Sequence, residues 1–384
     1  MFYKTRTSTI QPKALTYTGS FHCKTHSTLL VFVFILFCIG TAMALCLPLV
    51  VPLSHLKQLL FLLFYFAALA TGYFSTFPQL IKGSLSIFCC IFIPLSISLP
   101  FFPERLIPTP LIHSAALASP LLFTLVLCYL QNLRGLGLII PPAILGLCTA
   151  IFLLHRQLAD CLVTLFSCTL IFLAALWQDW FGLKSKKLCA LVSAAILAGT
   201  GFMLWLFGNT ILQHFFFALH PESDPLYFGY IGTTIRLLLS SSKPFGTGSA
   251  VLQNLPPIIT DSISAAALHV WGWVPVLIFY FGLFTFLFWC LAKALYLKNR
   301  FCQLAVFSIL LTMGTQTLFS ALFTCGYTFW NSSCPFLTRG PILATNMFLT
   351  GTLLSLFRQD IDAEDALLLV PAEKWFAYFS CLKD

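Results

Sequence analysis

The chain has 384 residues, of which 59% are hydrophobic and only 9% are charged, and its mean hydropathy is +0.93. A water-soluble domain of this length could not cover such an apolar core with so little polar surface, which excludes a soluble enzyme or binding module. The net charge of +9 is not gathered in a basic stripe with interleaved aromatic residues in a soluble segment. We therefore expect it to reflect membrane topology and anionic lipid contact, and we expect no nucleic-acid partner.

Apolar runs of membrane-spanning length recur between residues 29 and 358, so the sequence predicts an all-α integral membrane protein. Residues 1–28 are expected to form a cytoplasmic N-terminal tail, residues 29–358 a polytopic membrane domain, and residues 359–384 a cytoplasmic C-terminal tail. The ten predicted transmembrane helices are 29–51, 58–77, 84–102, 111–131, 136–154, 160–178, 188–208, 263–291, 302–325 and 340–357.

Lysine and arginine residues set the expected orientation, because cytoplasmic loops are enriched in them. With ten spans and the N-terminus inside, most of the 21 basic residues fall in cytoplasmic segments, as Lys184, Lys186 and Lys187 do. Both termini are therefore predicted to lie in the cytoplasm.

Most connections are short, but an outer loop of residues 209–262 separates the seventh and eighth predicted spans. Connections this long are usually functional or disordered. Within the loop, the apolar run Thr233 to Leu239 with Arg236 predicts an amphipathic or re-entrant helix. Gly246 and Gly248 indicate a tight turn.

Acidic residues are rare, with 12 in the whole chain, half of them after residue 359. Asp261 stands out because it precedes a strongly apolar segment, where a carboxylate is costly and marks a functional site by default. Alternatively, Thr260 or Asp261 is only the N-cap of the eighth span, and the residues alone favour that interpretation. His269, eight residues on, would share a helix side with Asp261, although a lone histidine there is more often a packed residue than a catalytic one.

The 15 cysteines are scattered, mostly within predicted spans, and show no metal-binding spacing with histidine. Cys325 and Cys334 both fall near the last outer loop, but sequence alone does not show the geometry of a disulfide, so their pairing stays open.

The order of motifs from residue 220 to residue 358 resembles the SEDS family, the shape, elongation, division and sporulation proteins that include RodA and FtsW. That family shows G-Y-Q, then F-G-x-G, then L-P-E-x-H-T-D with a later glycine, and finally Q…G…P-F-x-S-x-G…N. The matching residues here are Gly229-Tyr230, Phe245-Gly246-Thr247-Gly248, Leu255-Pro256, Thr260-Asp261, Gly272, Gln316, Gly326, Pro335-Phe336, Gly340 and Asn346. The ten-span layout and the large outer loop are also similar.

The resemblance implies a peptidoglycan glycosyltransferase that polymerises lipid II at the outer face of the bacterial cytoplasmic (inner) membrane. The implied partners are a class B penicillin-binding transpeptidase and other elongation or division proteins. Asp261 would be the catalytic base that accepts the proton of the attacking sugar hydroxyl. The leaving diphosphate would need positive charge from Arg236, Lys243 or Arg339, or from a divalent cation, Mg²⁺ or Mn²⁺, and Thr260 and His269 would assist in binding substrate.

The chain also departs from the family pattern. Ile231 replaces the glutamine of G-Y-Q, Pro257 the glutamate of L-P-E, and Ile259 the histidine of H-T-D. The family motif Q-P-S-E-x-x-K best matches residues 107–113, with His113 in place of the lysine, and Q-P-D-x-G is hinted at by residues 157–160.

These departures leave two further hypotheses open. One is a non-catalytic SEDS-like scaffold or regulator of a penicillin-binding transpeptidase, which the lost family acids favour and Asp261 opposes. The other is a transporter of lipid-linked precursor, which ranks last because no paired, interrupted spans are evident.

Overall fold

The computed structural model describes residues 19–45, 55–101, 109–130, 136–155, 157–177, 186–206, 208–226, 229–246, 263–297, 299–329 and 333–359. Within these ranges every regular element is helical. The long helices of the bundle are α1 (Gly19–Leu45), α2 (His55–Phe74), α3 (Phe77–Phe101), α4 (Thr109–Leu130), α5 (Leu136–Leu154), α6 (Leu158–Trp177), α7 (Lys186–Leu206), α12 (Trp273–Ala294), α13 (Arg300–Thr324) and α14 (Pro341–Gln359). The shorter elements are α8 (Gly208–Leu219), the 3₁₀ turn η1 (Pro221–Ser223), α9 (Tyr230–Ser241) and α11 (Ile263–Trp271).

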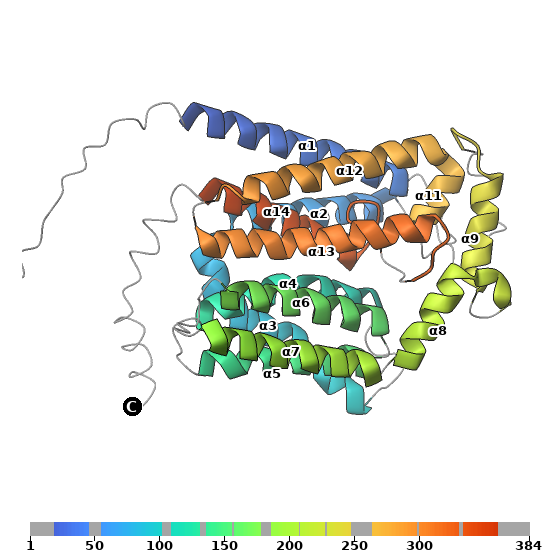
Figure 1. The fold of residues 1–384 in the computed structure, drawn as a ribbon. Coiled ribbons are helices and arrows are strands. Elements are labelled where there is room, and N and C mark those ends of the chain that lie inside the picture. Colours follow the sequence, from blue (N-terminus) through green and yellow to red (C-terminus); the bar gives the residue numbers. More distant parts are fainter. Residues whose placement is uncertain are drawn as a thin grey trace, which may run out of the picture.

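The long helices run side by side, and α8 and α9 lie at one end of the bundle, beside α11 (Figure 1). We call this end the α9 end. Of the described helices, α3, α4, α6, α12 and α13 are long and apolar enough on their own to cross a membrane. The chain is thus a multi-pass, all-α membrane protein, as predicted.

Over the described residues, each of the ten predicted spans overlaps mainly with one helix, except the eighth. A single helix from residue 263 to 291 was expected, and that prediction is wrong: the segment is divided at Gly272 into α11 and α12. Gly272 has a φ of 90°, a conformation that side chains with a Cβ rarely adopt, so the helix ends there. Pro275 then lies in the first turn of α12, where its missing N–H costs nothing.

Apolar side chains cover the outside of the bundle as well as its core. Along α12, Ile278, Phe281 and Phe288 are each more than 60% exposed, while Leu283 and Phe286 on the other side are fully buried. A helix that is apolar all round is typical of a membrane span, because lipid takes the place of water on its exposed face.

Helices α2 and α14 cross closely, with glycine facing glycine. A Cβ on Gly72 would lie 2.3 Å from the carbonyl oxygen of Phe348, and one on Gly351 would lie 2.2 Å from that of Leu69. Small residues at both positions let the two backbones touch, which is how apolar helices associate without a hydrophobic driving force between them.

The proline within α4 is accommodated by a neighbouring hydroxyl group. Pro120 lies inside α4 and lacks the N–H that would bond to the Ala116 carbonyl. The hydroxyl of Ser119 donates to that carbonyl instead, at 2.6 Å. α4 therefore continues through the proline with this acceptor satisfied.

Candidate functional site

The α9 end contains the segment that the sequence marked as a long outer loop, and much of it is helical. α9 confirms the predicted helix over Thr233 to Leu239. α8 was not predicted, because its apolar residues continue the seventh predicted span without a clear boundary other than Gly208. Thr260 and Asp261 lie outside the described residues, as does Gly248. In the sequence they immediately precede Ile263, where α11 begins.

The turn at Gly246 packs directly on the break between α11 and α12. The N–H of Val274 donates to the carbonyl of Pro244 at 3.1 Å, and the N–H of Gly246 donates to the carbonyl of Lys243 at 3.2 Å. Gly246 has a φ of 84°, and a Cβ on it would lie 2.0 Å from the carbonyl oxygen of Val270. The F-G-x-G turn at Gly246 and the later glycine, Gly272, are separate in the sequence but are in contact in the structure. The chain therefore leaves the turn beside α11.

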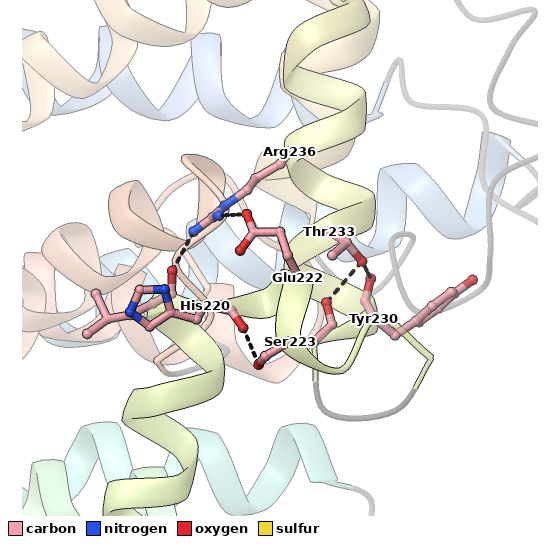
Figure 2. Close-up of polar contacts among 8 residues, drawn as sticks. His220, Glu222, Ser223, Tyr230, Thr233 and Arg236 are labelled. Carbon is pink, nitrogen blue, oxygen red and sulfur yellow. Dashed lines mark hydrogen bonds and ion pairs between the residues drawn. The ribbon is translucent and has the colours of Figure 1, made fainter.

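Arg236, a predicted substrate-binding residue, holds three parts of the α9 end together (Figure 2). It is ion-paired through Nη1 with Glu222 of η1, and its Nη2 donates to the Leu219 carbonyl at 3.1 Å. Its guanidinium also lies over the ring of Tyr327, 5.3 Å from the centroid, in the loop after α13. The pKa of Glu222 is lowered, first by a hydrogen bond from its own main-chain N–H and further by the charge of Arg236. These contacts give Arg236 a role in positioning the segment.

The other two predicted basic residues have different surroundings. Lys243 is exposed just after α9. Arg339 is half-buried in the loop before α14, and burial lowers the pKa of its guanidinium because desolvation disfavours the charged form. Its neighbour Gly340 donates its N–H to the Tyr65 hydroxyl of α2 at 2.9 Å. Arg339 is thus a cation held at the surface of the bundle by a fixed backbone.

His269 is buried in α11, only 4% exposed, so its position favours the packed histidine over a substrate ligand. The sequence left open whether Cys325 and Cys334 form a disulfide, and in the structure both are free thiols. Cys325 is exposed at the end of α13, whereas Cys334 is completely buried, and burial raises its thiol pKa to about 12.

No three His, Cys, Asp or Glu side chains of the described residues lie together as a metal site would require.

The sequence did not predict one contact between two ionisable side chains of the bundle. His113 of α4 and Asp160 of α6 form a salt bridge, with Nδ1 and Oδ2 2.6 Å apart. The sequence placed each of them at a polar position of a different motif, 47 residues apart. The signal that could have joined them is that both lie near the start of a span on the same side of the membrane.

No protein-family model matches the sequence, and no curated protein matches it. Solved structures do match its fold. A chain from a structure describing the coordination of polymerization and crosslinking by a peptidoglycan synthase complex has 17% sequence identity and a TM-score of 0.63, over 87% of this chain and 97% of that one. The rod shape determining protein RodA of Thermus thermophilus has 16% identity and a TM-score of 0.54, over 87% of this chain and 96% of RodA. A variant of that RodA with an aspartate replaced by alanine has 15% identity and a TM-score of 0.53, over 87% of this chain and 97% of the variant.

The helices, the break at Gly272 and the elements at the α9 end define a multi-pass, all-α membrane bundle. The bundle has the SEDS fold, the fold of RodA, over most of the chain.

Proposed function

We propose that the protein is a peptidoglycan glycosyltransferase that polymerises lipid II at the outer face of the bacterial cytoplasmic membrane, in cell elongation or division. The observation that carries the proposal is the SEDS fold together with the turn at Gly246 docked on Gly272. That contact joins two of the motifs on either side of Asp261, in a chain that otherwise has few acids. The α9 end is then the outer face, and both termini are cytoplasmic.

In this proposal Asp261 is the general base. The 4-hydroxyl of one sugar attacks the anomeric carbon of a lipid-linked donor, and a carboxylate that accepts the hydroxyl proton makes the oxygen a better nucleophile. Thr260, the preceding residue, assists in binding the acceptor. The buried His269 has a packing role within α11.

The departing diphosphate requires positive charge as it leaves. Arg339 is the strongest candidate among the predicted cations, because it is half-buried and interactions with a desolvated cation are less screened. Lys243 is more exposed and would contribute less. A divalent cation, Mg²⁺ or Mn²⁺, would need ligands from Asp261 and from substrate, since the described residues offer no cluster of three. We assign Arg236 to holding the outer segment in place.

The proposed partner is a class B penicillin-binding transpeptidase, which would crosslink the glycan strands as they form. The fold match to a chain of a peptidoglycan synthase complex supports this pairing.

Purified protein, alone and with its cognate transpeptidase, should convert labelled lipid II to glycan strands. Asp261→Asn should abolish the product, whereas the matched control Asp224→Asn, an acid just after η1, should retain it. Absence of glycan in every pairing, alongside normal complex formation, would instead establish the non-catalytic scaffold. Two prolines favour that second function: Pro110 stands at the glutamate of the family motif Q-P-S-E-x-x-K, and Pro257 at the glutamate of L-P-E.

A further inference from the structure

The short helix α8 presents an apolar face that the described part of the protein leaves exposed. Leu212, Phe215, Phe216 and Leu219 recur at intervals of three and four residues, so they share one side of the helix. Their side chains are between 40% and 68% exposed, and Phe215 touches the ring of Phe329, with the centroids 4.9 Å apart. We call these four residues the α8 row. A contiguous apolar surface of this kind marks a site of interaction with a partner or a membrane.

α9, the neighbouring short helix, has the opposite arrangement. Its apolar residues Ile235 and Leu238 are buried. Ile235 belongs to a cluster with Ala265 of α11 and Phe323 of α13. The protein itself therefore covers the apolar face of α9, and α8 is the helix of the outer segment whose apolar face is left for another partner.

α7 brings the chain to the edge of the membrane just before α8. Its 21 residues rise about 1.5 Å each, or about 30 Å together, which is the thickness of the hydrocarbon core of a bilayer. Trp205, next to the last residue of α7, is 73% exposed, and tryptophan is enriched at the boundary between lipid and water. Since α8 begins at Gly208, two residues after α7 ends, it starts at this boundary.

The exposed apolar surface of the bundle leads directly to α8. Leu191, Phe202 and Trp205 lie on one side of α7, and each is more than half exposed. Lipid covers such a surface on a membrane span. α8 turns away from the direction of α7 and crosses the end of the bundle (Figure 1), and its main contacts with the described elements are to α7 and η1. The chain thus passes from a lipid-covered span straight into a helix with an exposed apolar face.

We propose that α8 lies in the membrane leaflet at the α9 end, with the α8 row inserted among the lipid chains. Helices with one apolar face bind in this way at the boundary between headgroups and acyl chains, with that face buried about 5–10 Å. α8 contains no lysine, arginine, aspartate or glutamate, so its binding depends on apolar contact and not on the charge of the headgroups. The inference stands apart from the proposed catalytic activity.

Insertion of α8 fixes the outer segment relative to the membrane. The carbonyl of Leu219, the last residue of α8, accepts a hydrogen bond from Nη2 of Arg236 at 3.1 Å. Arg236 lies on α9 and is also ion-paired with Glu222 of η1. Because α9 is bonded in this way to the end of α8, a helix held in the leaflet keeps α9 at the level of the lipid headgroups.

The first test is photo-crosslinking of the purified full-length protein in vesicles of phosphatidylcholine, a lipid without net charge. p-Benzoylphenylalanine replaces Leu212, at the centre of the α8 row, or Gln213, an exposed neighbour that the helix places about 100° further round. Mass spectrometry then identifies the molecule bonded at each position. We expect phosphatidylcholine at position 212, with a yield about tenfold higher than at position 213, the ratio that burial of one apolar side chain supports.

The second test places one new charge at each of the same two positions. Leu212→Asp should release α8 from the lipid, because a carboxylate is costly to remove from water. Cleavage by chymotrypsin between α8 and α9, in the same vesicles, should become about tenfold faster or more. Gln213→Asp adds the same charge beside the row and should be cleaved at the wild-type rate, as should Leu212→Phe, which keeps the row apolar.

Two results overturn the inference. One is an adduct at position 212 to another part of this chain or to a second copy, or a lipid yield equal to that at position 213. The other is equal cleavage of Leu212→Asp and Gln213→Asp. If Leu212→Asp does not fold, the crosslinking decides. Neither measurement depends on glycan synthesis, so a failure of this inference and a failure of the proposed function are seen separately.

Discussion

Pro244 and Val274 are joined by a main-chain hydrogen bond of 3.1 Å that ties the end of the outer segment to the start of α12. The contact is close because Gly272 has no side chain: a Cβ there would lie 2.3 Å from the carbonyl oxygen of Pro244 and 2.3 Å from the nitrogen of Gly246. The stretch of chain that contains Asp261 leaves this contact at residue 246 and enters α11 at Ile263. The contact thus sets where that stretch begins.

Gly272→Ala is expected to separate the turn from the helix break. The positive φ and the two backbone clashes together should cost about 1–3 kcal/mol of stability, and glycan synthesis should fall as well. Thermal unfolding in detergent and a lipid II polymerisation assay would measure the two effects. Gly199→Ala is the matched control: a Cβ there meets nothing within 4 Å and alanine favours the helix, so it should lower neither stability nor glycan synthesis.

The spans were predictable because each is a long apolar run, and in lipid such a run satisfies its backbone only as a helix. The break at Gly272 was not, because one glycine between two tryptophans does not interrupt the apolar pattern. Pairings between distant helices were also hidden. Nothing in the local sequence of Arg236 indicates that Glu222 and Tyr327 are its partners. The local sequence of His113 likewise does not indicate its contact with Asp160. The site residues were found through motif order, which shows what lies near Asp261 but not what each side chain contacts.

Arg236→Ala should loosen the outer segment. It removes the contact with the Tyr327 ring, which contributes about 0.5–1 kcal/mol at a partly exposed site, together with the bonds to Glu222 and the Leu219 carbonyl. We expect lower stability and faster proteolysis between α8 and α9. Arg358→Ala is a matched control, because Arg358 lies over the Tyr73 ring at the other end of the bundle. It should lose stability while proteolysis of the outer segment stays unchanged.

Acidification should weaken the Glu222 contact. The pKa of Glu222 is lowered in the folded protein, so its contribution is present above the ordinary value of 4.5 and is lost as the pH falls through the lowered one. Glu222 is 65% exposed, so the effect is small. Between pH 6 and pH 3, the melting temperature of wild type should fall slightly more than that of Glu222→Gln. Equal slopes would show that the ion pair contributes nothing measurable.

Tyr65→Phe should weaken the anchor of the last loop. The variant leaves the part-buried Gly340 N–H without its acceptor, and a hydrogen bond of this kind contributes about 0.5–1.5 kcal/mol. Thermal unfolding would measure the loss. Tyr296→Phe, at an exposed position after α12, removes the same hydroxyl and should change stability little. A similar loss in both variants would contradict a specific role for the Tyr65 hydroxyl.

Arg339→Gln should reduce glycan synthesis without reducing the stability of the fold. The pKa of Arg339 is lowered by burial, because desolvation of this cation in the folded protein costs free energy. Replacing it with a neutral side chain removes that cost together with the contacts of the cation, so the melting temperature should change little. If Arg339 neutralises the departing diphosphate, glycan synthesis should nevertheless fall at least about tenfold, the effect of one lost charged hydrogen bond. Arg339→Lys should restore part of the activity, since it keeps the charge but not the planar pair of donors. A loss of stability and activity in parallel, with no rescue by lysine, would instead make Arg339 a structural residue like Arg236.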